Sequence, residues 1–373
     1  MIAKALVWFL LLIILPDMFI WLRFLRKKCW WVQTLWFVPC LLFVTATVLL
    51  SLERDFVPDD MTWLNVYLIA IGLLVAPKLI FAVGSLFGKK GRLVSLALAP
   101  MVWFVVLYGS FVGNQRLEVK RVELSFTDLP QSFDGYRIVQ FTDIHLGSMD
   151  AAFLQEVIDS INAQKADMVA FTGDIQNKMP SEIKPFMKQL KKIKSKDGVF
   201  SVMGNHDYVY YIDDDTPPPV RYANERQLVR LQQDLGWQLL LNSYRVVKHG
   251  GDSIIVSGLE NDGENRFPQE GNINQALAGV ARNEFIVMME HDPSAWKRKI
   301  LRECHAQLTL SGHTHGMQFE LFGWSPLSLL RKESDGLYRM GSRCLYVSKG
   351  VGGVVPFRFG ATPEIVVITL RKQ

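Results

Sequence analysis

Two stretches of similar form decide the fold of this chain: YRIVQFTDIH at residues 136–145 and MVAFTGDIQN at residues 168–177. Each begins as an apolar run of strand length and ends on polar residues. Between them, residues 151–165 place Leu154, Val157 and Ile161 at the spacing of one helix face. A strand, a helix and a second strand of this kind predict an α/β domain built on a packed sheet.

The same alternation continues towards the end of the chain. Further β-rich runs are predicted at residues 199–203, 254–258, 285–289, 307–310, 345–347 and 365–370. A Lys-rich amphipathic helix is predicted at 181–196, and the Asp- and Pro-rich stretch 208–222 is typical of a surface loop. We therefore expect an α/β domain over residues 136–373, preceded by a linker and first strand at 114–135.

The composition predicts that part of the chain is embedded in a membrane. Of 373 residues, 49% are hydrophobic, and the mean hydropathy of +0.15 is high for a soluble protein. A transmembrane region is expected at 1–113, with spans at about 5–25, 30–51, 62–87 and 93–113. Each span has the roughly 20 residues that a helix needs to cross the hydrocarbon core.

The basic residues indicate the orientation of these spans. The first and third connections are basic, through Arg23, Arg26, Lys27, Lys28, Lys89, Lys90 and Arg92, whereas the second connection is acidic. Basic connections face the cytoplasm, so we expect a multi-pass protein of the cell (inner) membrane with its C-terminal domain outside the cytoplasm. Arg116, Lys120 and Arg121 favour the opposite side weakly.

Charge and cysteine content exclude several other classes of protein. Residues 113–373 hold 31 Lys or Arg and 31 Asp or Glu, so the net charge of +5 arises in the first third of the chain. A neutral domain argues against nucleic acid as a stable partner. The four cysteines lack CxxC spacing, which argues against a disulfide scaffold or a thiolate zinc site.

Two ionisable residues, Asp17 and Lys78, fall inside the predicted spans, each beside a proline. One interpretation is a path for an ion or substrate through the membrane. The interpretation that we favour is a kinked helix in which the carboxylate and the ammonium pair with each other or snorkel to the membrane surface, because no further acid or histidine continues a path through the spans.

Polar residues follow five of the β-rich runs. The residues are Asp143 and His145; Asp174 and Asn177; Asn205, His206 and Asp207; His291; and His313 and His315. Ligands and catalytic groups of α/β sheets collect at the carboxyl ends of strands. We therefore expect these side chains to converge on one site, whereas His249 and His305 lack this context and are interpreted as structural.

The donor types favour a metal centre. Histidine nitrogens with Asp and Asn oxygens, and no thiolates, suit Mn, Fe or Zn, with Mg as a further possibility. The candidate ligands are Asp143, His145, Asp174, Asn205, His291, His313 and His315. Seven ligands exceed what one ordinary ion takes and fit two divalent ions that share a carboxylate, an arrangement suited to displacement at phosphorus.

This ordered set of motifs resembles the calcineurin-like metallophosphoesterase family over about residues 136–370. The segments around Met317 and from 348 to 365 resemble its membrane-anchored bacterial YkuE/YaeI-like subgroup, although Met317 stands where a glycine is expected. The resemblance implies a two-sheet β-sandwich flanked by helices, with a dinuclear metal centre at the strand ends.

The resemblance also implies roles for single residues. Asp143, His145, Asp174 and His315 would hold one ion, and Asp174 as the bridge would hold the other with Asn205, His291 and His313. His206 would protonate the leaving oxygen, and Asp207 would orient its imidazole. Asn177 would brace the substrate side of the site. Arg358 is a candidate phosphate contact because its fork matches phosphate oxygens, with a surface ion pair as the alternative.

The expected function is that of a membrane-anchored dinuclear-metal phosphohydrolase. A bridging hydroxide would attack a phosphomonoester, phosphodiester or pyrophosphate that is lipid-linked or nucleotide-linked, next to membrane lipids. One alternative is a role like that of UDP-2,3-diacylglucosamine hydrolase in lipid A biosynthesis, which needs a cytoplasmic substrate. Another is a non-catalytic metal-binding membrane scaffold.

Overall fold

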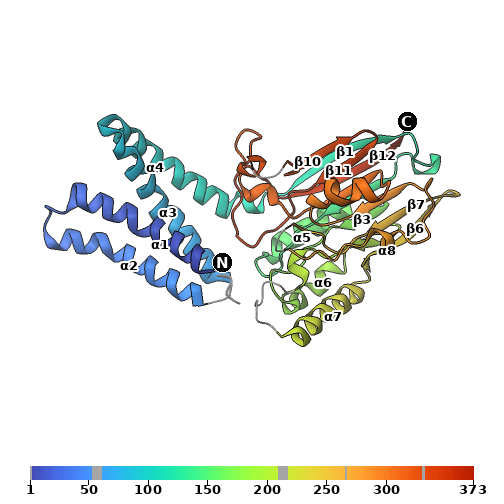
Figure 1. The fold of residues 1–373 in the computed structure, drawn as a ribbon, viewed down its shortest axis with the longest axis horizontal. Helices are drawn as coiled ribbons and strands as arrows, with labels where there is room; N and C mark the ends of the chain where they lie inside the picture. The colour runs from blue at the N-terminus through green and yellow to red at the C-terminus, as the bar shows by residue number, and fades with distance from the viewer. Residues whose placement is uncertain (1, 53–60, 209–216, 265–266, 330–331) are drawn as a thin grey trace. The chain divides into compact units, whose positions relative to one another are not determined.

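The computed structural model describes residues 2–52, 61–208, 217–264, 267–329 and 332–373. The chain forms two compact units, Met1–Val112 and Gly113–Gln373, which are drawn in blue to teal and in green to red in Figure 1. Each unit has its own packing and is described by itself.

The first unit consists of long apolar helices: α1 (Ile2–Ile20), which continues as a π-helical turn (Trp21–Leu25), α2 (Trp30–Leu52), α3 (Met61–Leu86) and α4 (Gly88–Phe111). Four segments are long and apolar enough to cross a membrane: Leu6–Leu25, Trp30–Leu52, Met61–Leu86 and Gly88–Gln115. They coincide closely with the four predicted spans. The acidic connection expected at 53–60 lies outside the described residues.

Asp17 and Lys78 form an ion pair inside this unit. Lys78 Nζ lies 2.8 Å from Asp17 Oδ1 and 3.1 Å from Oδ2. The ammonium also lies over the ring of Trp36, whose Nε1 donates to the carbonyl oxygen of Asp17 at 3.2 Å. The pairing that the sequence favoured is confirmed.

The second unit contains two six-stranded sheets. The first has the order β1-β12-β2-β3-β4-β5 and the second β10-β11-β9-β8-β7-β6. The strands of the first sheet are β1 (Glu118–Phe126), β2 (Arg137–Phe141), β3 (Met168–Phe171), β4 (Val199–Ser201), β5 (Gln238–Leu239) and β12 (Glu364–Lys372). Those of the second are β6 (Ser243–His249), β7 (Asp252–Gly258), β8 (Ile286–Met289), β9 (Leu308–Ser311), β10 (Gly336–Met340) and β11 (Arg343–Val347).

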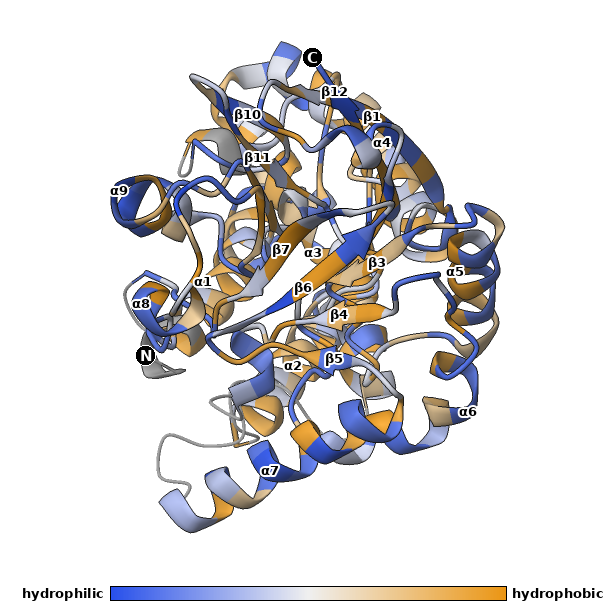
Figure 2. Ribbon diagram, turned by 90° about the vertical axis from the view of Figure 1, so that its right-hand side faces the viewer, coloured by the Kyte–Doolittle hydropathy of each residue, from blue (hydrophilic) through white to orange (hydrophobic). Residues whose placement is uncertain are grey.

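The two sheets pack face to face around a buried core. Ile138 and Phe200 from the first sheet share one apolar cluster with Val256 and Val287 from the second. The outer face of the first sheet is covered by α5 (Ala151–Ala163), which buries its predicted apolar face. The remaining helices are α6 (Met187–Leu190), α7 (Pro218–Asp234), α8 (Ile273–Ala276) and α9 (Leu301–Glu303). Figure 2 shows that α5, α6 and α7 carry hydrophilic residues on the surface. The predicted two-sheet sandwich flanked by helices is confirmed.

Two sequence-based assignments need correction. The helix predicted at 181–196 is a 3-10 helix (Pro180–Phe186) followed by the single turn of α6, because Pro185 has no N–H to donate inside a longer helix. Of the loop predicted at 208–222, residues 209–216 lie outside the described residues, and Pro218–Tyr222 begin α7. Proline at the start of a helix costs nothing, since the first N–H groups have no partner there.

Candidate metal centre

The polar residues that follow the strands lie together because their strands run parallel. β2, β3 and β4 are parallel neighbours in the first sheet, and β8 and β9 are parallel in the second. Their carboxyl ends therefore reach the same edge of each sheet, and the loops that leave them converge.

The loops hold their side chains through unusual backbone conformations. Five residues of the site have a positive φ although none is glycine: Asp143 (55°), His145 (52°), Asp174 (58°), His313 (73°) and His315 (51°). Such conformations cost free energy and persist where the surroundings enforce them, often at functional sites. Gly204 allows the loops to approach closely, because a Cβ there would lie 2.2 Å from Asp174 Oδ1.

One group of donors comes from β2, β3 and β9. His145 Nε2 lies 3.3 Å from His315 Nε2 and 3.7 Å from Asp174 Oδ2. His315 Nε2 lies 3.4 Å from Asp143 Oδ1. Two atoms bound to the same ion at about 2.1 Å are separated by about 3.0–3.5 Å. Four buried or half-buried donors at this spacing fit a divalent ion.

A second group comes from β3, β4, β8 and β9. His291 Nε2 lies 3.1 Å from Asp174 Oδ2 and 3.2 Å from Asn205 Oδ1. His313 Nδ1 lies 2.7 Å from the same Asn205 oxygen. His291 Nδ1 is 2.7 Å from the carbonyl oxygen of Thr172, which can only accept, so Nδ1 carries the proton and Nε2 faces the donors. Asp174 thus lies between the two groups, as a bridging ligand must.

The electrostatics favour the metal-binding protonation states of His145, His315 and Asp174. They do not favour that of His291: burial would lower its pKa, but Asp174 and Asp143 hold it well above the usual value. Burial, together with the neighbouring His206, lowers the pKa of His145 to about 3. Burial also holds the pKa of His315 well below its usual value. Burial would raise the pKa of Asp174, but His291 and His206 together hold it well below the ordinary value. Neutral imidazoles and an ionised carboxylate are the forms that bind a divalent ion.

His206 lies beside this centre. Its ring is 4.8 Å from the ring of His145, and its backbone N–H donates to Asp174 Oδ1 at 2.9 Å. His206 Nδ1 is 2.6 Å from the carbonyl oxygen of Asn177. The group that orients this imidazole is therefore a backbone carbonyl.

Asp207 occupies a different place from the predicted one. Its carboxylate accepts the backbone N–H groups of Asp174 and Gly204, both at 2.9 Å, and of Ile175 at 3.1 Å. The side chain is fully buried and ties the loop after β3 to the loop after β4. The expectation that Asp207 orients His206 is corrected: both of its oxygens are engaged by backbone donors.

The two predicted substrate-side residues also have structural partners. The side chain of Asn177 donates to Ser148 Oγ at 3.3 Å, and its backbone N–H donates to Glu182. Arg358 is only 2% exposed, so the alternative of a surface ion pair is wrong. Its guanidinium donates to three backbone carbonyls, and Nη2 lies 3.3 Å from His315 Nδ1.

Sequence reasoning missed several supporting residues. Glu182 accepts the backbone N–H groups of residues 177–179, and its position three residues after Met179 at a helix start is a signal that could have revealed it. The ring of Phe267 lies 4.9 Å from that of His313, and no sequence pattern indicates this contact. His249 lies outside the centre, against the rings of Phe133 and Tyr136.

Comparisons with known proteins agree with the fold. Residues 136–317 match the calcineurin-like phosphoesterase family. A transmembrane protein with metallophosphoesterase domain from Danio rerio is 27% identical over 97% of this chain and 87% of its own length. A metallophosphoesterase of Campylobacter jejuni is 28% identical over 97% of this chain and 96% of its own. The metallophosphoesterase YkuE of Bacillus subtilis is 28% identical over 71% and 89%.

Two of these relatives align with nearly the whole length of this chain, so the similarity includes the apolar N-terminal helices as well as the phosphoesterase domain. The family consists of metal-dependent phosphoester hydrolases with a dinuclear centre, and the present site offers His and Asp groups that can hold a metal. Residues 136–317 therefore match the calcineurin-like phosphoesterases, and the domain that contains them follows four candidate membrane spans.

Proposed function

We propose that this protein is a membrane-anchored phosphohydrolase that cleaves a phosphomonoester, phosphodiester or pyrophosphate bond with two divalent ions. The observation that carries the proposal is the position of Asp174 between two sets of donors, with Oδ2 3.7 Å from His145 Nε2 and 3.1 Å from His291 Nε2. A structural metal site has no need for a second set of ligands around a shared carboxylate.

The ligands divide as the donor distances suggest. Asp143, His145, Asp174 and His315 would hold one ion, and Asp174, Asn205, His291 and His313 the other. The donor set suits Mn, Fe or Zn, and Mg less well. When bound, the two ions supply Lewis-acid polarisation of the phosphoryl oxygens and an activated hydroxide.

The chain's own contribution to the chemistry is the placement of His206. Because the carbonyl oxygen of Asn177 accepts from Nδ1, proton transfer to a leaving oxygen falls to Nε2. The acid form is then the imidazolium, with both nitrogens protonated. Asp207 keeps the loop that carries His206 in register with the loop that carries Asp174. Arg358 lies next to the ring of His315, on the side of Nδ1.

The membrane region bears on the substrate. We propose that the phosphoesterase domain lies on the extracytoplasmic side of the cell (inner) membrane, because the basic connections next to Cys29 and Lys89 favour the cytoplasm. Tethering by four spans favours a phosphate ester at or near the bilayer surface, with membrane lipids as neighbours.

The test uses the purified full chain in detergent. Total metal analysis is expected to give about two ions per chain, with Mn-stimulated hydrolysis of an aryl phosphomonoester or phosphodiester. Asp174→Ala, which removes the shared carboxylate, should lose both metal and turnover. Asp159→Ala, which removes an exposed carboxylate from α5, is the matched control and should lose neither.

Each other outcome contradicts a part of the proposal. Full metal content in Asp174→Ala would refute the shared ligand. Two ions with no turnover on any phosphate ester would favour the non-catalytic scaffold.

A further inference from the structure

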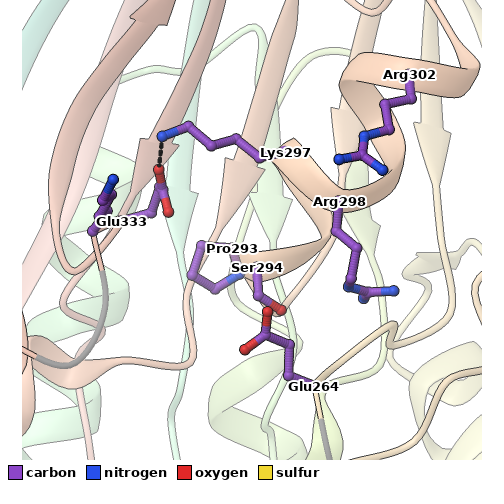
Figure 3. Close-up of a pocket in the computed structure, with 8 residues that line it drawn as sticks. Glu264, Pro293, Ser294, Lys297, Arg298, Arg302 and Glu333 are labelled. Atoms are coloured by element: carbon purple, nitrogen blue, oxygen red, sulfur yellow. Dashed lines mark ion pairs between the residues drawn. The ribbon is translucent and has the colours of Figure 1, made fainter.

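A charged cavity is lined by residues of the loops and helical turns that follow strands of the second sheet (Figure 3). It has a volume of about 350 Å³ and is bordered by the π-helix Trp296–Ile300 and the following α9. The charged side chains that line it are Lys297, Arg298, Arg302, Lys332, Glu264 and Glu333. Figure 3 shows Lys297, Arg298 and Arg302 projecting from this one helical segment.

The cavity is separated from a candidate metal ligand by a single carboxylate. Pro293 and Ser294 line the cavity and follow His291 in the chain. The backbone N–H of Ser294 donates to Asp292 Oδ1 at 2.9 Å, whereas Oδ2 of Asp292 lies 3.5 Å from His313 Nε2. The side chain of Asp292 therefore contacts both a residue that lines the cavity and a candidate metal ligand.

Positively charged side chains outnumber negatively charged ones around the cavity, whereas the domain as a whole is neutral. Lys297 pairs with Glu333 at 2.5 Å, and Arg298 pairs with Asp262. Among the described residues, neither Arg302 nor Lys332 has an ion pair with a carboxylate. Arg298 and Arg302 are four residues apart on one helical segment, where like charges repel, so folding alone does not favour them together.

This set of side chains has the chemistry of a phosphate site. A guanidinium presents a planar fork that matches two phosphate oxygens, and lysine adds a point charge. Because residues 113–373 are neutral as a whole, four cations around one cavity are not explained by general surface charge.

We propose that this cavity binds a second phosphate group of the substrate, while the scissile phosphate lies at the metal centre. The inference rests on the proposed function and narrows it to substrates that carry two phosphate groups separated by a spacer. Arg302 and Lys332 would contact the second phosphate directly. Lys297 and Arg298 would add charge while held by their carboxylates.

The experiment measures equilibrium binding of defined probes to the metal-loaded full chain by calorimetry. The probes are α,ω-alkanediol bisphosphates of short, medium and long spacer, each compared with the alkyl monophosphate of the same length. At least one bisphosphate should bind about tenfold or more tightly than its monophosphate, a difference of about 1.4 kcal/mol. The variant Arg302→Gln/Lys332→Gln should reduce this ratio to near one.

A matched variant controls for net charge. Arg245→Gln/Lys248→Gln removes the same two charges from exposed positions on β6 and should keep the wild-type ratio. If the wild-type ratio is near one for every spacer, or if both double variants lower it equally, the inference is overturned. A wild-type protein that fails to hydrolyse aryl phosphates contradicts the proposed function instead, since the ratio is measured without turnover.

Two further probes distinguish a soluble from a lipid source of the second phosphate. Inositol 1,4-bisphosphate is compared with phosphatidylinositol 4-phosphate in mixed micelles, which carries the same headgroup. Tighter binding of the lipid, lost in Arg302→Gln/Lys332→Gln, assigns the site to a lipid headgroup. Equal binding of the two, lost in the same variant, assigns it to a soluble bisphosphate, and binding of both that survives in the variant overturns the inference.

Discussion

His206 shares a possible metal-binding group with His145 and Asp174, and we propose that it moves a proton without binding metal. Its Nδ1 is held by a carbonyl oxygen at 2.6 Å, and the side chain is half-buried beside His145. His206→Ala should therefore keep its metal content and lose about 10²–10⁴-fold in kcat, the usual scale for a general acid. Steady-state kinetics beside metal analysis check this, and loss of metal together with turnover would make His206 a ligand instead.

The control for His206 is Asn177→Ala. The oxygen that accepts from His206 belongs to the backbone of Asn177, so the substitution leaves this contact in place. We expect a much smaller loss of kcat than in His206→Ala. An equal loss would mean that the Asn177 side chain itself acts on the substrate.

Asp207 belongs to the structure of the loops more than to the chemistry. Asp207→Ala removes the acceptor of three buried backbone N–H groups, and each unpaired donor costs about 1–3 kcal/mol. The variant should show a lower midpoint of thermal unfolding and weaker metal binding. A variant as stable as the wild type, with only kcat reduced, would restore the predicted contact between Asp207 and the His206 imidazole.

At this scale the sequence indicated which residues belong to the site but not how they act on one another. His145, Asp174 and His313 could be found because each follows a β-rich run and the ends of parallel strands converge. The partner of His206 could not be found in this way, because every residue has a backbone carbonyl and the sequence does not show which of them the imidazole contacts. Arg358 was expected to contact phosphate or to form a surface ion pair, and only the fold shows that its guanidinium is surrounded by carbonyl oxygens.

At the scale of a structural element, a tight turn that follows His315 in the chain carries backbone strain. Leu321 and Trp324 pair across two residues, Phe322 and Gly323, whose φ angles are 52° and 77°. A bulky residue is unfavourable in the left-handed region, whereas asparagine adopts it readily in such turns. Phe322 is 99% exposed, so its ring contributes no packing to offset this strain.

Phe322→Asn should therefore raise the free energy of unfolding by about 0.5–1 kcal/mol. The measurement is the midpoint of thermal unfolding of the full chain in detergent. Phe322→Ala is the matched control, because it removes the same ring and keeps the strain, and we expect little change. Stabilisation by both substitutions to the same degree would show that the exposed ring, not the backbone, is the cause.

The ion pair between Asp17 of α1 and Lys78 of α3 is a second feature that acts between structural elements. Asp17→Asn leaves the Lys78 ammonium without its carboxylate, and breaking a buried pair costs up to about 3–5 kcal/mol. The variant should unfold at a lower temperature, while hydrolysis of a soluble aryl phosphate at low temperature stays at the wild-type rate. Asp17→Leu/Lys78→Met should recover much of the stability.

The opposite result would change the interpretation of the membrane region. If Asp17→Asn were as stable as the wild type but inactive, the pair would be part of a path through the spans.

Three edge strands were not identified from the sequence, although β1, which is also an edge strand, was expected within 114–135. β5, β6 and β10 lie at the ends of their sheets, and in β6 most side chains are exposed or half-buried. A central strand such as β3 is buried along its whole length, which gives the continuous apolar run that a sequence reveals. An edge strand has fewer neighbours and gives no such run.

At the scale of the whole molecule, the two units place their large apolar residues in opposite ways. In the first unit Trp30, Leu52 and Phe87 are 76–77% exposed, whereas in the second the apolar clusters lie inside the sandwich. Water favours only the second arrangement, and hydrocarbon favours the first. The full chain should therefore sediment with membranes after a salt or alkaline wash and be released only by detergent; release by the wash alone would contradict spanning helices.

The side of the membrane can be tested with cysteines, because the number of spans fixes which segments share a side. With four spans, Cys29 in the basic first connection and the domain that follows the last span lie on opposite sides. A membrane-impermeant maleimide applied to intact cells, with the outer membrane opened where one is present, should label a Gln373→Cys variant in a Cys29→Ser background. It should label the exposed Cys29 of the wild type only after permeabilisation. The reverse pattern would place the domain in the cytoplasm, where a UDP-sugar substrate is available, and would show that Arg116, Lys120 and Arg121 outweigh the other connections.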